Sequence, residues 1–594
     1  MGFSMMAART LMNVAAMVAT VAALHTFFGW LSGNDSYLYW FMCLFAWRYL
    51  RFFVNLVAFW CYSPAPPPKD REPTYMPSRD VTAVIPTVDP EGAAFRGCLE
   101  ACAQNEPAKI VVVTAGDELY AAALAAVKEF EERFPLTQFV VSRTQEVSKR
   151  KQVALAVPHI ETDITVLLDD HVFWGPRFLQ SVLYAFEDSE VGLVGTNKQV
   201  RCPNGLGLWV RIWNMLGATY LCRHNFEIRA TNTVDRGVFV VSGRTCAIRT
   251  EILRHPEFLP GYTNEKFFFG LFGPLNADDD NYVTRFVVRH GWHIKIQYTD
   301  DATMETILGV EHPPATKFLA QCRRWARTTW RSNVCSLVTD RTVWRRQPYC
   351  VYAVYLTSLT NFAAIIDPLL VYLFSRSSAC VSGAALGGLV SWILLTKVVK
   401  VFDHFRRHPR NIVLFPAYVA FAYFHSFLKL WALLTFWDCT WNGRKLEQIK
   451  VDRGRSKQAE KEAQADAHPH TPALRALRAR IAHLCGQHSS HVRSYQQPII
   501  DELQRLDGSF AALRREQRVM ADNHETIRAA LGRVVAQADD AAAGQNAALS
   551  SDDAELVEAI ARVTAAVGGA ENRWRGYMRR VMMGAGVGQN GEAC

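Results

Sequence analysis

The stretch ITVLLDDHVFW, residues 164–174, is an apolar run that stops abruptly on two acids and an imidazole. Its first five residues predict a buried strand, because short apolar and β-branched runs form the centre of α/β sheets. Asp169 and His171 follow in the form Asp-x-His, and positions i and i+2 of an extended chain point to the same side. They could hold a divalent cation on a diphosphate, and the imidazole favours Mn²⁺ over Mg²⁺. The alternative is a surface acid cluster, and the apolar strand counts against it.

Three more runs of the same texture precede this strand, with helical stretches between them. The runs are 81–85, 110–113 and 138–141, and 121–134 is one intervening helix. This alternation predicts an α/β domain with a mixed, mostly parallel sheet. Ligands bind outside the carboxyl ends of such strands, so 169–171 should lie at the lip of a crevice. Thr87 and Asp117 end the first two runs on polar residues, and both also suit ordinary sheet structure.

A second acidic cluster, Asp278-Asp279-Asp280, follows the aromatic and Gly-rich run FFFGLFGPL and precedes an expected helix over 282–290. Three adjacent carboxylates repel one another, so at least one could have a raised pKa suited to accepting a proton. The alternative is an acid-rich helix N-terminus, which is common because acids complement the helix dipole.

The motif Gln321-Cys-Arg-Arg324-Trp325 begins a run that continues with further arginines and tryptophans at helical spacing, up to residue 331. Cationic and aromatic residues in this pattern suit an interfacial helix before a membrane span. Guanidinium groups also suit a diphosphate, and an indole suits the apolar face of a sugar ring. Both interpretations stay open.

Two apolar runs at the N-terminus, 11–31 and 37–59, are long enough to cross a bilayer. A signal peptide is the rival for the first run, but that run is long for one and a second run follows it. Arg48 and Arg51 share one helix face of the second run, and charge at that depth is costly unless it faces water or protein. Either the span ends early, or this face lines a polar passage.

Three apolar blocks follow the soluble region, over 349–374, 381–396 and 412–437. The basic stretch 400–410 between the last two predicts a cytoplasmic connection. Two crossings before the soluble region and three after it would put the C-terminus outside, unless the last block, interrupted by Pro416, His425 and Lys429, is bent or re-entrant. The sequence leaves this open.

The composition fits a multidomain protein: 594 residues, 50% hydrophobic, with a formal net charge of +9. Lys and Arg are spread along the chain, so a nucleic-acid partner has little support and anionic small substrates or lipid headgroups fit better. The 14 Cys form no CxxC pair, which predicts mostly reduced thiols. Heptads over 499–534 predict a coiled coil that either joins copies of the chain or packs inside the tail.

These motifs, in this order, resemble the membrane-embedded, processive family-2 glycosyltransferases, which include hyaluronan, cellulose and chitin synthases. The resemblance covers roughly residues 10–445 and is closest to the hyaluronan synthase and fungal capsule-type branch. Its landmarks are the strand ending at Asp169, the Ser242-Gly243 loop, Asp279-Asp280, the motif Gln321, Arg324 and Trp325, and Trp441-Asn-Gly-Arg444, together with the basic pair Lys149-Arg150. Three landmarks depart from the family pattern: His171 replaces an acid, Asp278 replaces a glycine, and Trp-Asn-Gly-Arg replaces Trp-Gly-Thr-Arg.

The resemblance implies a GT-A-like cytosolic domain that uses a UDP-sugar, and a plasma-membrane channel that carries the growing polysaccharide out. Asp280 would be the general base with Asp279 beside it, His171 and Asp169 would hold Mn²⁺ or Mg²⁺, and Ser242 and Gly243 would form an acceptor loop. The expected nucleotide and substrate contacts are Thr87, Asp117, Lys149, Arg150, Asp169, Gln321, Arg324, Trp325, Trp441 and Arg444. A transferase that adds one sugar to a lipid or protein, and an inactive membrane scaffold, are the alternatives.

The expected divisions are two N-terminal transmembrane helices (10–62), a Pro-rich linker (63–79), the GT-A-like domain (80–315), interfacial helices (316–346), transmembrane or re-entrant helices (349–437), a gating loop (438–445) and a polar tail (446–594).

Overall fold

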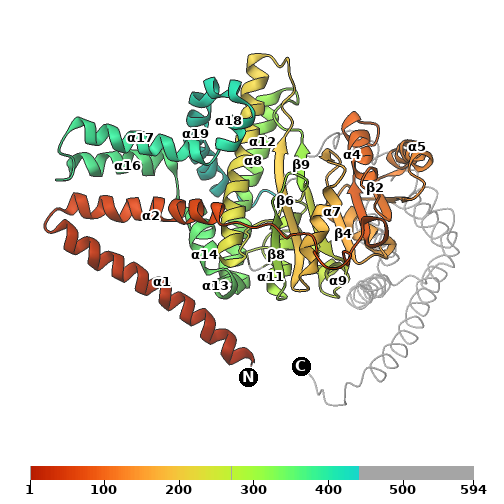
Figure 1. Ribbon diagram of the computed structural model, residues 1–594, viewed down its shortest axis with the longest axis horizontal. Coiled ribbons are helices and arrows are strands. Elements are labelled where there is room, and N and C mark those ends of the chain that lie inside the picture. The colour runs from red at the N-terminus through yellow and green to blue at the C-terminus, as the bar shows by residue number, and fades with distance from the viewer. Residues whose placement is uncertain (1, 269, 440–594) are drawn as a thin grey trace, which may run out of the picture. The chain divides into compact units, whose positions relative to one another are not determined.

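The computed structural model describes residues 2–268 and 270–439, which form a sheet domain joined to a group of long apolar helices (Figure 1). Two predicted features lie outside the described residues, the gating loop with Trp441 and Arg444 and the coiled coil.

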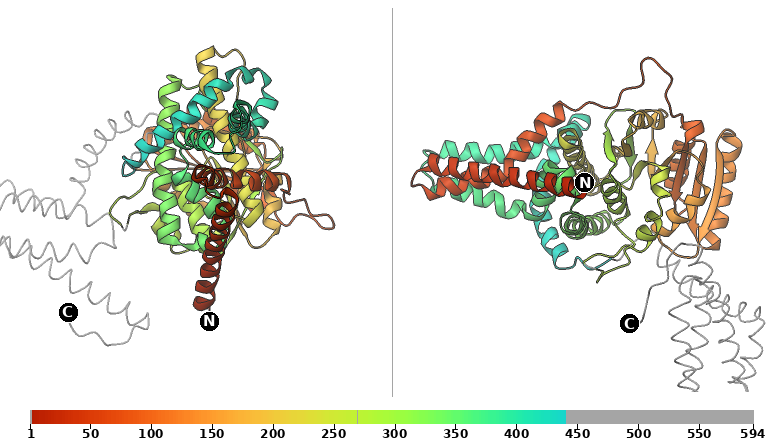
Figure 2. Two further views of the ribbon diagram at one scale, coloured as in Figure 1. Left: turned by 90° about the vertical axis from the view of Figure 1, so that its left-hand side faces the viewer. Right: turned by 90° about the horizontal axis from the view of Figure 1, so that it is seen from below.

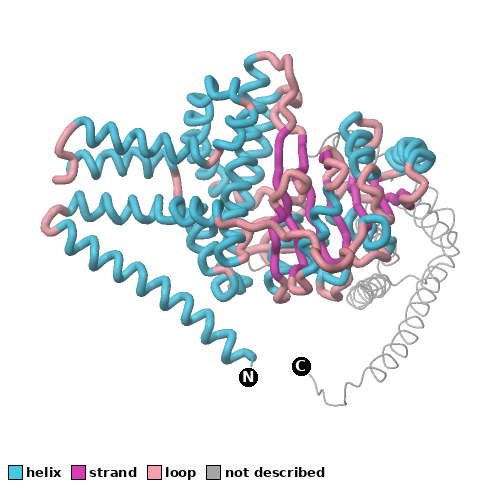
Figure 3. Tube along the Cα trace, in the orientation of Figure 1, coloured by secondary structure: helices cyan, strands magenta, loops and turns pink. Residues whose placement is uncertain are grey.

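The sheet contains the four predicted strands in the order β3-β2-β1-β4, all parallel. The sheet continues through β7, β6, β9 and β5, and β8 pairs with β6. Strand β7 is antiparallel to both of its neighbours, β4 and β6. The prediction of a mixed, mostly parallel sheet is confirmed, and the strands stand out together in Figure 3. The strands are β1 (Val81–Pro86), β2 (Lys109–Ala115), β3 (Gln138–Thr144), β4 (Ile164–Leu168), β5 (Val172–Trp174), β6 (Val191–Val200), β7 (Thr245–Arg249), β8 (His293–Gln297) and β9 (Thr303–Thr306).

The central strands are apolar along their whole length because the sheet is covered on both faces. In β1, Ala83 and Ile85 pack into one buried core with α4 and α5, whereas Val84 packs into a second core with α6 and α11. The helices of this domain are α3 (Pro77–Asp80), α4 (Ala93–Ala103), α5 (Asp117–Arg133), α6 (Lys149–Ala156), η1 (Val157–His159), α7 (Phe178–Leu183), η2 (Tyr184–Glu187), α8 (Leu208–Asp235), α9 (Thr250–Leu253), α10 (Phe258–Thr263) and α11 (Asp279–Arg289).

The Gln-x-x-Arg-Trp motif lies on α12 (Pro314–Thr328), which continues into the π-helical turns η3 (Thr329–Asn333) and η4 (Cys335–Asp340). α12 packs against α8 and α19 (Phe415–Leu433). The motif therefore lies between the sheet domain and the apolar helices. The other helices after it are α13 (Thr342–Arg346), α14 (Pro348–Cys350), η5 (Val351–Leu356), α15 (Thr357–Thr360), α16 (Ala363–Arg376), α17 (Gly383–Val399), α18 (Phe402–Arg407) and η6 (Pro409–Leu414).

Within the described residues, three helical segments are long and apolar enough to cross a membrane, at 8–32, 36–60 and 409–433. The first two are α1 (Gly2–Ser32) and α2 (Ser36–Trp60). A fourth is possible if the bent pair 348–360 and 363–376 counts as one span. In Figures 1 and 2, α2, α16 and α17 run side by side away from the sheet domain, whereas α19 runs across them.

The apolar block 349–374 is not one straight helix, because the chain bends by 93° between Thr360 and Ala363. Polar side chains bind the backbone at this break: the Lys429 ammonium donates to the Asn361 carbonyl (3.2 Å), and the Ala364 N–H donates to the Ser426 hydroxyl (3.1 Å). A broken helix is tolerated in a membrane protein only where its free backbone groups find such partners.

Candidate active site

One cavity of about 1160 Å³ begins at the carboxyl edge of the sheet and extends between the apolar helices. His171 and Asp280 both line it, as the hypothesis of a shared substrate site requires. The other predicted site residues that line it are Thr87, Lys149, Asp169, Ser242, Gly243, Asp279, Gln321, Arg324 and Trp325.

Lys149 joins the two acidic motifs. Its ammonium lies 2.7 Å from a carboxylate oxygen of Asp169 and 3.0 Å from one of Asp279, and it donates to the Gly243 carbonyl (3.2 Å). Although burial opposes its charge, these two carboxylates raise the pKa of Lys149 well above its usual value. Burial likewise opposes ionisation of Asp169, but Lys149 outweighs it and lowers the pKa of that carboxyl. The ends of strand β4 and helix α11 are thus held together by one mostly buried cation.

Asp280 is oriented by donors on both carboxylate oxygens. Oδ2 accepts from the Gly243 N–H (3.1 Å), and Oδ1 accepts from the N–H and the side-chain amide of Asn281 (2.9 and 3.0 Å). Burial, reinforced by the neighbouring Asp279, raises its pKa to about 6. A carboxylate with a pKa close to neutral is suited to general base catalysis.

Gly243 allows this close approach. A Cβ at position 243 would lie 3.1 Å from the Asp280 Cβ and 3.3 Å from the Lys149 Nζ. Any side chain here would press on the two charged groups that define the site.

Asp278 has a different role from its two neighbours. Its backbone is left-handed, with φ of 60°, and its carboxylate is 2.7 Å from the Arg331 guanidinium and accepts from the Thr328 hydroxyl (2.5 Å). Asp tolerates the left-handed region better than most residues, which explains how it can stand where the resembling family has glycine. Asp278 therefore anchors the start of α11 to α12 and η3.

His171 is oriented through two neighbours. The Thr87 hydroxyl donates to one oxygen of Asp170 (2.8 Å), and the other oxygen lies 3.0 Å from the His171 Nδ1. A carboxylate on one ring nitrogen is the usual support for a histidine that binds a metal through the other. His171 therefore fits the predicted role of metal ligand, with Thr87 and Asp170 as its support.

The indole of Trp325 lies against the ring of Tyr220, with centroids 5.0 Å apart, and beneath the guanidinium of Arg244, 5.3 Å from its centroid. Arg324 lines the same part of the cavity. This wall combines flat aromatic surface with two guanidinium groups.

Two predicted contact residues do not line the cavity. Asp117, at the start of α5, forms an ion pair with Arg143, and its side chain is 59% exposed. Arg150 is buried, and its two terminal nitrogens bind Glu265 (2.7 Å) and the carbonyls of Tyr262 and Ala277 (both 2.7 Å). Position i+1 on the helix points Arg150 away from the cavity that Lys149 faces, so its role is to hold the segment before α11.

The cavity also contains basic and aromatic groups that sequence reasoning missed. Arg244 follows the Ser242-Gly243 loop directly, so that landmark could have indicated it. Lys198 lies within β6 and His224 within α8, where no motif marks them. Burial lowers the pKa of Lys198 to about 7, with Arg244 acting in the same direction.

The far end of the cavity is lined by cations from the apolar helices, including Arg48, Arg51 and Lys397. Arg48 and Lys397 both pair with the buried Asp367 of α16 (2.6 and 2.8 Å), and Arg51 donates to the Ala353 carbonyl and the Thr357 hydroxyl (both 2.8 Å). The arginine face of α2 thus lines a polar space, which is one of the two alternatives open from the sequence.

The chain is similar to several known proteins. Residues 77–328 match the model of a family described as "Glycosyltransferase like family 2". A type 2 glycosyltransferase of Gibberella zeae is 40% identical over 423 residues, covering 69% of this chain and 76% of the relative, and one of Pyricularia oryzae is 37% identical, covering 67% and 80%. A mannosyltransferase from Pyrobaculum calidifontis, solved with GDP-Man and Mn²⁺, is 15% identical and covers 66% of this chain and 97% of that structure, with a TM-score of 0.42.

Proposed function

The chain belongs to family 2 of the glycosyltransferases, and on that premise we propose that it polymerises sugars from UDP-sugar donors and passes the polymer through its own membrane helices. The chain is a glycosyltransferase by its family; processivity, donor and polymer export are the proposal.

The continuity of the cavity carries this proposal. Asp280 and His171 lie at one end of the cavity, and Arg48, Arg51 and Lys397 of the apolar helices lie at the other. A polar passage through helices that cross a bilayer costs free energy, and ionisable residues at that depth typically mark a substrate path. A transferase that adds one sugar needs only the first half of this cavity.

The residues at the sheet edge suit inverting transfer. Asp280 would accept the proton of the acceptor hydroxyl as that oxygen attacks the anomeric carbon, and the UDP leaving group would depart from the opposite face. Arg324 and Arg244, on the adjoining wall, would stabilise the charge that develops on the diphosphate. Trp325 would present a flat surface to the acceptor sugar.

His171 and Asp169 are the residues that would hold Mn²⁺ or Mg²⁺. Such a cation supplies charge neutralisation at the diphosphate when bound. The support of His171 by Asp170 fits a ligand role, whereas the pairing of Asp169 with Lys149 means that this carboxylate must be shared or released when the cation binds.

We propose an even number of crossings, in which α1, α2, α16 and α17 span the membrane and α19 lies along its surface, although α19 is itself long enough to cross. α1 with α2, and α16 with α17, run away from the sheet domain, and α19 runs across them against α12 (Figure 2). If α19 lies along the membrane surface, the sheet domain and the chain that follows α19 lie on the same side of the membrane. We place that side in the cytosol of a plasma-membrane protein, where UDP-sugars are made.

The test is to incubate the purified, reconstituted protein with UDP-N-acetylglucosamine, UDP-glucuronic acid and UDP-glucose, singly and in pairs, with Mn²⁺ or Mg²⁺. UDP release and product size on a gel are then measured. A long, protease-resistant product supports the proposal. Release of UDP with transfer of single sugars would replace it with a non-processive transferase, and no release from any donor would overturn it.

A further inference from the structure

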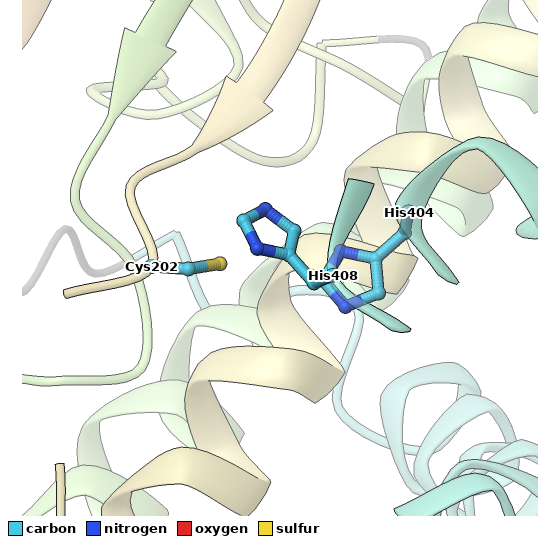
Figure 4. Close-up of side chains that lie close together, drawn as sticks. All are labelled: Cys202, His404 and His408. Atoms are coloured by element: carbon cyan, nitrogen blue, oxygen red, sulfur yellow. The ribbon is translucent and has the colours of Figure 1, made fainter. Parts of the chain in front are cut away.

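A second group of metal-binding side chains lies outside the active-site cavity. Cys202, His404 and His408 each offer a ligand atom, and these three atoms lie within 4.8 Å of one another. Figure 4 shows the cysteine sulfur and the two imidazole rings pointing into the same space. None of the three lines the cavity that holds Asp280.

The three ligands come from two parts of the chain that are far apart in sequence. Cys202 lies in the loop between β6 and α8, and His404 and His408 lie on α18 and at its C-terminal end. Residues four apart on a helix share one face, so both imidazoles are presented together. α18 packs against α8, which brings this face to the cysteine.

The donor set decides the class of metal. Two imidazoles and one thiolate are borderline to soft ligands, which select Zn²⁺ and similar transition metals over Mg²⁺ and Mn²⁺. In a tetrahedral Zn²⁺ site with bonds of about 2.0–2.3 Å, ligand atoms lie roughly 3.3–3.8 Å apart. The three ligand atoms are at most 4.8 Å apart here, and small side-chain rotations would bring them to the distances of a zinc site.

We propose that Cys202, His404 and His408 bind one Zn²⁺ ion, with the fourth position left to a solvent molecule. The proposal does not depend on the polymerising function. Binding forms one Zn–S and two Zn–N bonds and releases the proton of the Cys202 thiol to solvent. The unprotonated imidazoles supply the other two ligands.

The neighbours of the site fit this role with one rearrangement. The side-chain amide of Asn411 donates to the His404 Nε2 (3.1 Å), and the Cys202 thiol contacts the Val200 carbonyl (3.4 Å). Without metal these contacts satisfy the groups individually, and on binding they give way to the stronger metal bonds.

The site would link the enzyme domain to its membrane helices. On the enzyme side, β6 carries Lys198 into the active-site cavity and ends two residues before Cys202. On the membrane-helix side, α18 connects α17 to α19, and α19 packs on the helix of the Gln-x-x-Arg-Trp motif. Zn²⁺ at this position would fix the strand end and the helix connection relative to each other. It is therefore a structural site, separate from the exchangeable cation expected at His171.

The experiment measures metal in the full-length protein, purified in detergent with a tag that contains no histidine. Elemental analysis after dialysis against a weak chelator should find about one zinc per chain. Cys202→Ser and His408→Ala should each lower this to less than about 0.2 per chain. Cobalt added to zinc-free protein should give a sulfur-to-cobalt charge-transfer band that Cys202→Ser abolishes.

His255→Ala provides the matched control, because His255, Glu257 and His290 form another cluster of potential ligands. It should leave the zinc content and the cobalt band unchanged. Unchanged zinc in Cys202→Ser, zinc lost only in His255→Ala, or neither zinc nor a cobalt band in the parent protein would each overturn the proposal. The elution volume of each variant on size exclusion shows that it is folded.

Discussion

The acids at residues 278–280 illustrate how adjacent, identical side chains take separate roles. Asp278 pairs with Arg331, Asp279 with Lys149, and Asp280 accepts from backbone and amide donors. The helix start points successive side chains in different directions, so each carboxylate meets a different partner. Only Asp280 combines a place in the cavity with a raised pKa of about 6.

Replacing Asp280 by Asn should lower the rate of polymer synthesis by about 10²- to 10⁴-fold, the usual contribution of a general base. UDP-sugar binding should be retained, because Lys149 and Asp169 keep their contact. The carboxyl has a folded pKa above its usual 3.8, so its ionisation disfavours the folded state near neutral pH. Normal polymer output from Asp280→Asn would remove the base assignment.

The pH dependence of kcat/KM should show an acidic limb near pH 6. The base acts only when ionised, and the pKa of Asp280 is raised to about 6, so the rate should fall as pH drops through this value, by about tenfold per unit below it. Initial rates of UDP release between pH 4.5 and 8 test this. A limb near pH 4 would mean that the catalytic carboxyl is not buried as it is here.

Gly243→Ala should reduce transfer about tenfold or more, because its Cβ would press on Asp280 and Lys149 at 3.1 and 3.3 Å. Gly175→Ala is the control, since a Cβ there meets no atom within 4 Å. Equal rates for the two variants would show that the close approach at Gly243 has no role in catalysis. UDP-release rates at saturating donor give the comparison.

Helix α11 and the α12–η3 segment are held together by the buried pair of Asp278 and Arg331, whose side chains are 4% and 2% exposed. Each of these buried charged groups would lack its partner if the two segments met in another way. The pair therefore sets how α11, which carries Asp280, meets α12, which carries the Gln-x-x-Arg-Trp motif. The three acids and the motif are therefore parts of one structural unit.

Asp278→Gly should destabilise the protein by about 3–5 kcal/mol, although glycine suits the left-handed backbone, because Arg331 loses its buried partner. Adding Arg331→Met to the same chain should recover part of the loss, since no unpaired charge then remains. Thermal unfolding of both single variants and the double variant in detergent measures this. Lys128→Met, which removes an exposed cation of α5, should have almost no effect. A double variant less stable than the sum of both singles would contradict the explanation.

The continuity of the active-site cavity with the apolar helices is the property of the protein on which the proposed export rests. Asp367 pairs with both Arg48 and Lys397, so one buried carboxylate of α16 links α2 to α17 around this space. Charges at such depth persist where they face protein or water. The same helices thus line the far part of the cavity through which we propose that the polymer leaves.

A bulky side chain in the passage should shorten the polymer. Ala422 of α19 lines the cavity, whereas Ala420, two residues earlier on the same helix, is exposed. Ala422→Trp should lower product size on a gel while initial UDP release continues, because the first transfers take place before the chain reaches this point. Ala420→Trp should change neither quantity. Full-length product from Ala422→Trp would show that the polymer leaves by another route.

The strands between residues 81 and 168, their parallel pairing and the motifs of the site were predictable from the sequence, because continuous apolar runs and short spacings are local properties of the chain. The grouping of Asp169, Asp280, Arg324 and Trp325 was anticipated from family resemblance, and the structure places all four on one cavity. The sequence does not separate Lys149 from Arg150, but the helix turns the two side chains in different directions, and only Lys149 lines the cavity.

What the sequence by itself determined is therefore the kind of domain, the apolar segments and the identity of the chemical groups. Only the tertiary structure decided which partner each of the three adjacent acids meets, that Lys198 and Arg244 line the cavity, and that α2 turns Arg48 toward Asp367. The physical reason is that charge, burial and pKa depend on neighbours hundreds of residues away, and those neighbours are set by how helices and strands pack.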